Sequence, residues 1–192
     1  MKVYILRHGQ TDANKAHLLQ GRSNRPLNEE GIQQAKQAGE WFRTNKIQFN
    51  AVYSGPLQRA IQTAEIASGI SPQIDDRLTE MDYGPYEDMD LRNPHPEITE
   101  FFRDFIHVPA PAGMEPLDEV TGRLGAFLED LAKNPFEGNV LISTHAIAMK
   151  GALEYLTPES QGSYWHKFIG NCAVYITEYT EKGYSVPEEV YP

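Results

Sequence analysis

Three apolar segments of this chain each lead into an ionisable side chain and then a turn or helix, and this repetition limits the folds that the chain can adopt. The first segment, residues 3–6, is typical of a buried strand and ends at Arg7 and His8. Gly9 follows, where the lack of a side chain lets the backbone turn away. An Arg-His pair alone is a weak signal, but the two later segments strengthen it.

The other two segments have the same order of elements. Residues 51–54 predict a strand that a tight turn joins to a helix carrying Arg59, with Pro56 in the first turn of that helix. Residues 139–144 predict another strand, which ends at His145 just before a helix-forming segment. Each strand therefore delivers a cationic or ionisable side chain at its carboxyl end.

Alternating strands and helices predict an α/β fold, a three-layer α/β/α sandwich with a mostly parallel sheet and an antiparallel edge strand. In such sheets, ligands bind outside the carboxyl ends of the parallel strands. We therefore expect Arg7, His8, Arg59 and His145 to converge there, beside helix N-termini that suit an anion. The remaining predicted elements are helices over 28–44, 97–106 and 116–133 and strands over 171–179 and 184–186.

The size and charge of the chain narrow its function. Its 192 residues suit one domain over residues 1–192. The net charge of −10 argues against nucleic acid as a partner, because phosphate backbones require a basic face. No stretch approaches the roughly 20 apolar residues of a membrane span, and no signal peptide is expected. One cysteine, Cys172, fits a reducing cytoplasm, where we expect it to be a small buried hydrophobe.

The four converging side chains suit a tetrahedral phosphoryl group, which needs clustered cations shielded from water. Arg7 and Arg59 can supply bidentate contacts, and His145 can donate one more hydrogen bond. His8 is then the natural nucleophile, because a neutral imidazole nitrogen can attack phosphorus. Its other N–H would be held by a backbone carbonyl, such as that of Gly9, which fixes the tautomer.

Such a reaction also needs a proton donor for the leaving oxygen. Glu80 is the best candidate, because its apolar neighbours would favour a protonated carboxyl near neutrality. Asp82 and Glu87 are rivals that the local sequence does not dismiss.

Together, these residues resemble the histidine phosphatase superfamily, which includes the cofactor-dependent phosphoglycerate mutases and many small phosphatases. The matching motifs run in the family's order from residue 2 to about residue 156. They are Leu6-Arg7-His8-Gly9-Gln10-Thr11 with Asn14, Gln20-Gly21-Arg22, Pro26-Leu27-Asn28 with Gly31, Ser54-Gly55-Pro56-Leu57-Gln58-Arg59-Ala60 with Gln62-Thr63-Ala64, Leu78-Thr79-Glu80 and Ser143-Thr144-His145.

The resemblance implies that His8 is the phosphorylated nucleophile and Glu80 the acid, and that Arg7, Arg59 and His145 bind the phosphoryl group. It implies an enzyme that needs no cofactor and no metal and acts on a small-molecule phosphate ester, and the single cysteine already indicates a cytoplasmic one. Relatives are often homodimers, and the oligomeric state of this chain stays open. The expected substrate-binding residues are Asn14, Gln20, Gly21, Arg22, Tyr83 and Ala146.

Three departures from the family pattern leave the reacting groups in place. Ala146 stands where many relatives have glycine, Gly55 replaces a common serine, and Asp88 occupies a common glycine position.

Three functions stay open at this point. A phosphomonoester hydrolase is favoured, because the interval between Glu80 and His145 is shorter than mutases usually have. A mutase is the first alternative and a non-catalytic binder the second. Substrate identity is open. Arg22 and its neighbours could bind a second anionic group of a substrate or form a solvated loop. The spacing of Phe101, Phe102 and Phe105 favours core packing over a substrate lid.

Overall fold

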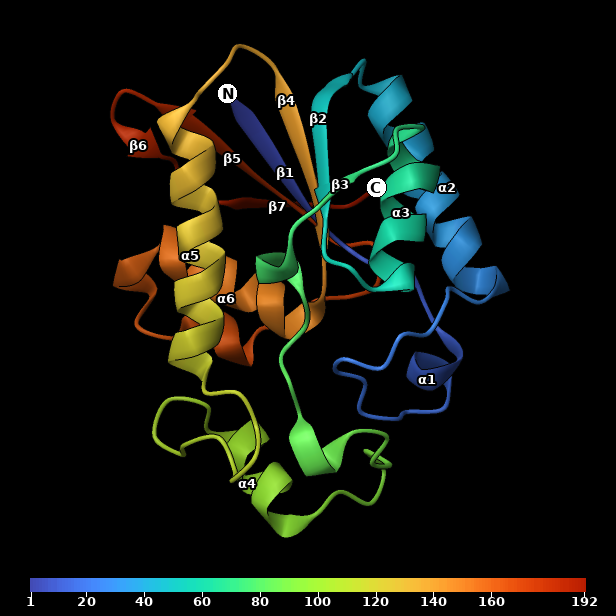
Figure 1. The fold of residues 1–192 in the computed structure, drawn as a ribbon, viewed down its shortest axis with the longest axis vertical. Helices are drawn as coiled ribbons and strands as arrows, with labels where there is room; N and C mark the ends of the chain where they lie inside the picture. Colours follow the sequence, from blue (N-terminus) through green and yellow to red (C-terminus); the bar gives the residue numbers. More distant parts are fainter.

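The computed structural model describes all residues, 1–192, and contains a seven-stranded sheet in the order β3-β2-β4-β1-β5-β6, with β7 paired to β5. The predicted α/β fold with a mostly parallel sheet is confirmed (Figure 1). The strands are β1 Lys2–Arg7, β2 Phe49–Ser54, β3 Gln73–Ile74, β4 Asn139–Thr144, β5 Val174–Thr180, β6 Gly183–Tyr184 and β7 Glu188–Val190.

The first four strands of that order are parallel, so their carboxyl ends meet at one edge. β1 and β2 both pair with β4, and the register aligns Leu6 and Ser54 with Ser143. β5 runs antiparallel to β1, and β6 and β7 run antiparallel to β5. β5 starts three residues later than predicted, because Cys172 adopts a left-handed φ of 56° within a turn.

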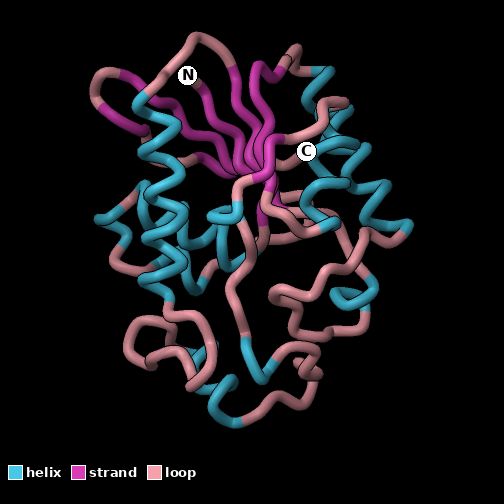
Figure 2. Tube along the Cα trace, in the orientation of Figure 1, coloured by secondary structure: helices cyan, strands magenta, loops and turns pink.

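Helices cover both faces of the sheet, as Figures 1 and 2 show. α2 and α3 lie on one face, and α5 and α6 lie on the other. The helices are α1 Asp12–Lys15, α2 Glu29–Thr44, α3 Gln58–Ser68, α4 Pro96–Arg103, α5 Leu117–Lys133 and α6 Ala146–Leu156.

The helix ends follow their sequence signals with one exception. Asn28 caps α2 by accepting a hydrogen bond from the Gly31 N–H, 2.9 Å away. α3 ends at Gly69, whose φ of 73° is left-handed. Pro56 precedes the N-cap residue Leu57, so it lies just before the helix rather than in its first turn as predicted.

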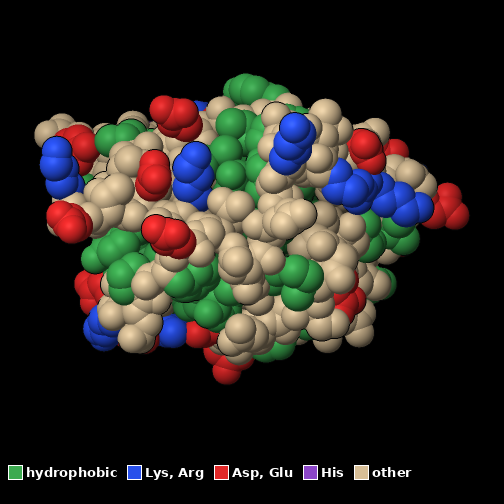
Figure 3. All heavy atoms as spheres, turned by 90° about the horizontal axis from the view of Figure 1, so that it is seen from above, with side chains coloured by type: hydrophobic (Ala, Val, Ile, Leu, Met, Phe, Trp, Pro, Cys, Tyr) green, Lys and Arg blue, Asp and Glu red, His purple; other side chains and the backbone are tan.

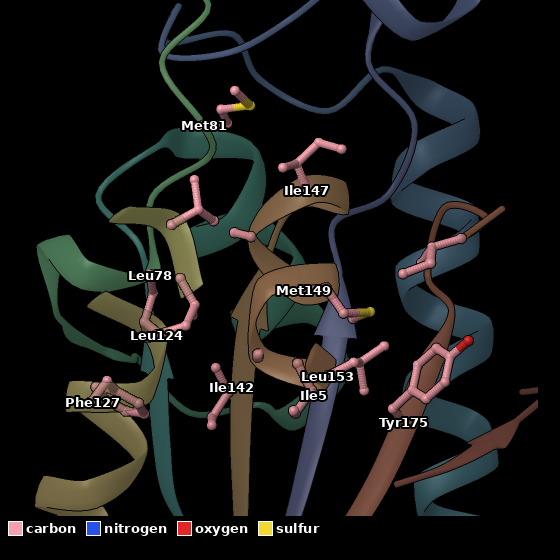
Figure 4. Packing of buried hydrophobic residues seen from close by; sticks show 14 of the residues in the cluster. Ile5, Leu78, Met81, Leu124, Phe127, Ile142, Ile147, Met149, Leu153 and Tyr175 are labelled. Carbon is pink, nitrogen blue, oxygen red and sulfur yellow. The ribbon is translucent and has the colours of Figure 1, made fainter. Parts of the chain in front are cut away.

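Two hydrophobic cores lie on the two faces of the sheet. One joins β1, β2 and β4 to α2 and α3, and the other joins β1 and β4 to α5 and α6. Figure 4 shows the second, in which Leu153 of α6 lies beside Ile5 of β1. Side chains alternate between the two cores along β1, because successive residues of a strand face opposite sides.

Beyond the carboxyl ends of the parallel strands lies a cap made from segments far apart in sequence. It contains α1, α4 and the 3₁₀ helix η2 (Gly84–Tyr86), seen at the bottom of Figure 1. The opposite end of the molecule carries acidic and basic side chains interspersed among apolar ones (Figure 3). No helix has the combined length and apolar character that crossing a bilayer requires.

Candidate active site

A cavity of about 440 Å³ lies between the carboxyl ends of the strands and the cap. Its polar lining combines two strand-end residues, Arg7 and His8, with Asn14, Gln20 and Glu80. The other lining residues are Leu18, Leu19, Tyr83, Leu91, Phe102, Phe105, Ala146, Ile147, Lys150, Trp165, His166, Lys167, Phe168 and Ile169. The fold thus brings a guanidinium, an imidazole and a carboxyl group to one cavity.

His8 is held in a single orientation at the end of β1. Its Nδ1 lies 2.6 Å from the Gly9 carbonyl oxygen, so this nitrogen carries the proton of the neutral ring and Nε2 keeps its lone pair. Burial lowers the pKa of His8 well below its usual value of 6.5, and the neighbouring cations Arg59 and Arg7 lower it further. A neutral imidazole with an available Nε2 is a nucleophile.

The backbone around His8 is fixed from two sides. Thr63, one turn after Arg59 on α3, accepts a hydrogen bond from the Gly9 N–H at 3.0 Å. The side chain of Asn171 donates to the His8 carbonyl oxygen at 3.0 Å. These contacts tie the end of β1 to α3 and to the turn before β5, and they leave the imidazole little freedom to move.

Arg7 turns into the cavity beside His8. One of its terminal nitrogens donates to the Ile169 carbonyl oxygen across 2.5 Å, whereas the buried Nε has no protein partner. Burial lowers the pKa of Arg7, and the Glu80 carboxylate partly opposes that effect. Buried donors are rarely left unpaired, so this Nε is suited to an incoming anion.

Arg59 and His145 form a pair directly behind the cavity lining, and neither side chain is exposed. Arg59 Nε donates to His145 Nδ1 at 3.2 Å, so the proton of neutral His145 lies on Nε2, which is buried without a partner. The rings of His145 and His8 have centroids 5.1 Å apart. Burial lowers the pKa of His145 well below 6.5 and that of Arg59 to about 10.

The loop over residues 20–23 wraps around Arg59. The two terminal nitrogens of Arg59 donate to the carbonyl oxygens of Gly21 and Ser23, at 2.5 and 2.7 Å. Gln20 lies between Thr11 and Arg59. With its amide oxygen toward Arg59, it accepts from Nη1 at 2.7 Å and shares the Nε–H, at 2.8 Å, with His145 Nδ1. A Cβ at position 21 would lie 2.7 Å from Met81 O, so only glycine fits here.

Glu87 holds the same loop from the cap side. Its carboxylate accepts hydrogen bonds from the backbone N–H groups of Gly21, Arg22 and Ser23, at 3.0 to 3.2 Å. Glu87 is therefore committed to the loop and does not line the cavity. Asp88, which occupies the family's common glycine position, has a left-handed φ of 65°, and that conformation explains the usual glycine.

Glu80 is the one candidate acid that reaches the cavity. It is 3% exposed, and its carboxylate accepts from the backbone N–H groups of Met81 (2.8 Å), Ile147 (3.2 Å) and Ala148 (2.9 Å). It thus occupies the N-terminus of α6, which the sequence suggested would be open to an anion. Asp82 is half-buried and caps Gly84 outside the lining.

The predicted substrate-binding residues divide into two groups. Asn14, Gln20, Tyr83 and Ala146 line the cavity, whereas Gly21 and Arg22 do not. Arg22 turns toward the cap, where it pairs with Glu115 at 3.3 Å. The loop therefore shapes the site through its backbone.

Several lining residues carried no recognised sequence signal. Core packing, which the helical spacing suggested for Phe101, Phe102 and Phe105, is confirmed: Phe101 is fully buried, and the other two pack half-buried against the same core. Phe102 and Phe105 also line the cavity, which the spacing did not indicate. The segment after α6 supplies Trp165, His166, Lys167 and Phe168. Lys150 also lines the wall, and its position one turn after Ala146 on α6 is the signal that could have identified it.

Comparisons with known proteins identify a matching family. The family described as "Histidine phosphatase superfamily (branch 1)" matches residues 3–189. The chain is 28% identical to "Probable phosphoglycerate mutase GpmB" of Salmonella choleraesuis over 187 residues, covering 94% of this chain and 86% of that protein.

Two solved structures share the fold. Phosphoserine phosphatase from Entamoeba histolytica, in complex with 3-phosphoglyceric acid, superposes with a TM-score of 0.80 at 24% identity, over 99% of this chain and 95% of that one. A mycobacterial glucosyl-3-phosphoglycerate phosphatase gives a TM-score of 0.82 at 24% identity, over 92% of each chain.

Proposed function

Because the chain belongs to the histidine phosphatase superfamily (branch 1), we propose that it is a metal-independent phosphomonoester hydrolase acting through a phosphohistidine on His8. The observation that carries the proposal is the pair of unpartnered buried donors beside His8, Arg7 Nε and His145 Nε2. A bound phosphoryl group would accept a hydrogen bond from each of these donors, and His8 Nε2 would supply the lone pair that attacks phosphorus.

The first step transfers the phosphoryl group to the protein. The lone pair of His8 Nε2 forms a bond to phosphorus as the bond from phosphorus to the alcohol oxygen breaks. The Gly9 carbonyl oxygen, which accepts a hydrogen bond from Nδ1–H, stabilises the positive charge that develops on the ring. The leaving oxygen takes a proton from Glu80, which ends the step as a carboxylate.

The second step returns the protein to its starting state. Water attacks phosphorus and loses a proton to the Glu80 carboxylate, and the N–P bond breaks to release inorganic phosphate. The roles of acid and base thus alternate on one carboxyl group.

Three backbone N–H groups, those of Met81, Ile147 and Ala148, hold the carboxyl group of Glu80 in the cavity. These contacts fix the orientation of its oxygens for proton transfer to the leaving group. The same N–H groups hydrogen-bond the carboxylate that the transfer produces.

The cationic groups stabilise the charge of the transferring phosphoryl group. Arg7 lines the cavity and keeps Nε free of protein partners. Arg59 acts through His145, whose Nε2–H it directs by donating to Nδ1. Such preorganised donors are worth about 10²–10³ in rate each.

Relatives of this chain include both a mutase and phosphatases by name. The hydrolase is favoured because the interval between Glu80 and His145 is short. It holds the 3₁₀ helix η2, α4, α5, β4 and their connecting loops, so it adds only η2, α4 and loops to the cap, and a small cap admits water to the phosphohistidine. The mutase alternative rests on the 28% identity to the protein named a phosphoglycerate mutase.

The test measures phosphate release from p-nitrophenyl phosphate and a metabolite panel, with EDTA present, in wild type and His8→Ala. Metal-independent release that depends on His8, with an acid-labile phosphoprotein trapped by rapid quench, supports the hydrolase. Rapid interconversion of phosphoglycerates without phosphate release supports the mutase. Turnover that persists in His8→Ala contradicts the mechanism.

A further inference from the structure

Beyond its polar floor, the cavity is walled by aromatic rings that the proposed chemistry does not use. Four of them form a continuous series: Tyr83 to Phe102, with centroids 6.4 Å apart, Phe102 to Phe105 at 5.5 Å, and Phe105 to Trp165 at 6.3 Å. All four line the cavity. They come from the cap and from the segment after α6, so the series exists only in the folded chain.

The edge of the cavity carries a fifth ring, on Phe168. This side chain is 86% exposed, which is far more than for any other phenylalanine in the chain. Phe168 adjoins the other apolar lining residues, and a contiguous apolar surface of this kind, rather than a single exposed ring, marks a binding site. Leu18 and Leu91 extend the apolar lining.

The cations of this wall are already engaged. Lys167 pairs with Glu189 at 2.8 Å. Lys150 donates to the Trp165 carbonyl oxygen at 2.7 Å, and its Nζ lies 5.3 Å from the centre of the Phe105 ring. Lys150 has no carboxylate partner, so of the two lysines it is the one that could instead bind a second anionic group of a substrate.

The volume favours a substrate larger than a short phosphorylated acid. The cavity of about 440 Å³ falls within the roughly 300–1,000 Å³ of sites that enclose drug-sized ligands. Arg7, His8 and Glu80 account for the phosphoryl end, and what remains of the lining is mainly aromatic and aliphatic.

Resting on the proposed hydrolase, we infer that the substrate is a phosphomonoester whose alcohol carries an aromatic ring, which packs against Phe102, Phe105 and Trp165. Planar rings stack in offset or edge-to-face arrangements against such a wall. A short acid such as phosphoserine would place its charged groups against these rings and leave most of the wall unused.

The test compares kcat/KM for benzyl phosphate, cyclohexylmethyl phosphate and phosphoserine. All three release alkyl alcohols, so differences report mainly on binding of the organic group. We expect benzyl phosphate to exceed phosphoserine by about tenfold or more, through a lower KM. The cyclohexyl ester should fall between them, since it has the volume of the ring without its π face.

Two cavity variants and one control locate the effect. Phe102→Leu and Trp165→Leu should each lower the ratio of kcat/KM for benzyl phosphate to kcat/KM for phosphoserine. Phe127→Leu removes a buried ring that contacts Tyr53 outside the cavity, and it should keep the ratio. If a variant fails to fold, calorimetric titration of wild type with benzylphosphonate and ethylphosphonate gives the same comparison without turnover.

Three outcomes overturn the inference. Equal kcat/KM for all three esters, with turnover still dependent on His8, removes it and leaves the hydrolase intact. A preference for phosphoserine that is lost in Lys150→Met would show that Lys150 binds a second anionic group of the substrate and that the aromatic rings do not select it. No phosphate release from any ester, together with equal binding of the two phosphonates, contradicts the hydrolase and this inference together.

Discussion

Arg59 Nε donates a hydrogen bond to Nδ1 of His145 across 3.2 Å, in a region where neither side chain is exposed. Because Nδ1 accepts, the proton of neutral His145 lies on Nε2, which has no partner within the protein. The same guanidinium holds the Gly21 and Ser23 carbonyl oxygens. One side chain therefore sets both a tautomer and the course of a loop.

This relationship predicts that Arg59→Lys is not a conservative change. A lysine ammonium cannot reach the two carbonyl oxygens and His145 with the fixed geometry of a guanidinium. We expect kcat/KM for phosphoester hydrolysis to fall by about 10²–10³. Arg77→Lys is the matched control, since Arg77 pairs with Asp75 and Asp130 away from the cavity. Wild-type kinetics in Arg59→Lys would refute the role of this residue.

Glu80→Gln should reveal the acid through its dependence on the leaving group. Without a proton donor, hydrolysis of an alkyl phosphate should slow by about 10²–10⁴. Hydrolysis of p-nitrophenyl phosphate should slow much less in its first step, because p-nitrophenolate leaves without a proton. Single-turnover kinetics with both substrates checks this. An equal loss for both would assign Glu80 a purely structural role at the N-terminus of α6.

Glu87→Ala should impair activity although Glu87 lies outside the cavity lining. Three backbone N–H groups of residues 21–23 lose their acceptor, at a cost of about 1–3 kcal/mol in unfolding free energy. The loosened loop then holds Arg59 less well, and we expect kcat to fall by about tenfold. Asp88→Asn is the control, because Asp88 contacts Arg25 at the surface and asparagine tolerates the left-handed φ. Denaturant unfolding and steady-state kinetics measure both effects.

Stability should decline below about pH 6.5 because His8 and His145 stay neutral in the folded protein. Their pKa values are lowered well below 6.5, so the unfolded chain binds protons that the folded chain does not. The unfolding free energy then falls as pH falls from about 6.5 toward the folded pKa values, by up to about 1.4 kcal/mol per pH unit for each imidazole. Above about pH 6.5, these two groups contribute no slope.

Urea unfolding of wild type, His8→Asn and His95→Asn between pH 5 and 8 tests this. Removing His8 should reduce the slope of unfolding free energy against pH, below about pH 6.5, by up to the roughly 1.4 kcal/mol per pH unit that one proton contributes. His95 is exposed, so its replacement should leave the slope as in wild type. An unchanged slope in His8→Asn would mean that this imidazole is protonated in the folded state.

The local sequence determined the repeating units of the fold. Apolar runs followed by turn and helix signals identified β1, β2 and β4, and the ends of those runs identified Arg7, His8, Arg59 and His145. Such features are readable because strand and helix patterns depend on near neighbours in the chain. The N-cap Asn28 and the C-terminal Gly69 of helices followed the same local rules.

Only the tertiary structure decided which carboxyl group reaches the cavity. Glu80 and Glu87 lie seven residues apart in similar surroundings, and their roles separate because Glu80 meets the N-terminus of α6 while Glu87 meets the loop over residues 21–23. The aromatic wall was hidden for the same reason. Phe102 and Trp165 are far apart in sequence and acquire a shared function only when the cap folds over the sheet, which depends on long-range packing that local patterns do not contain.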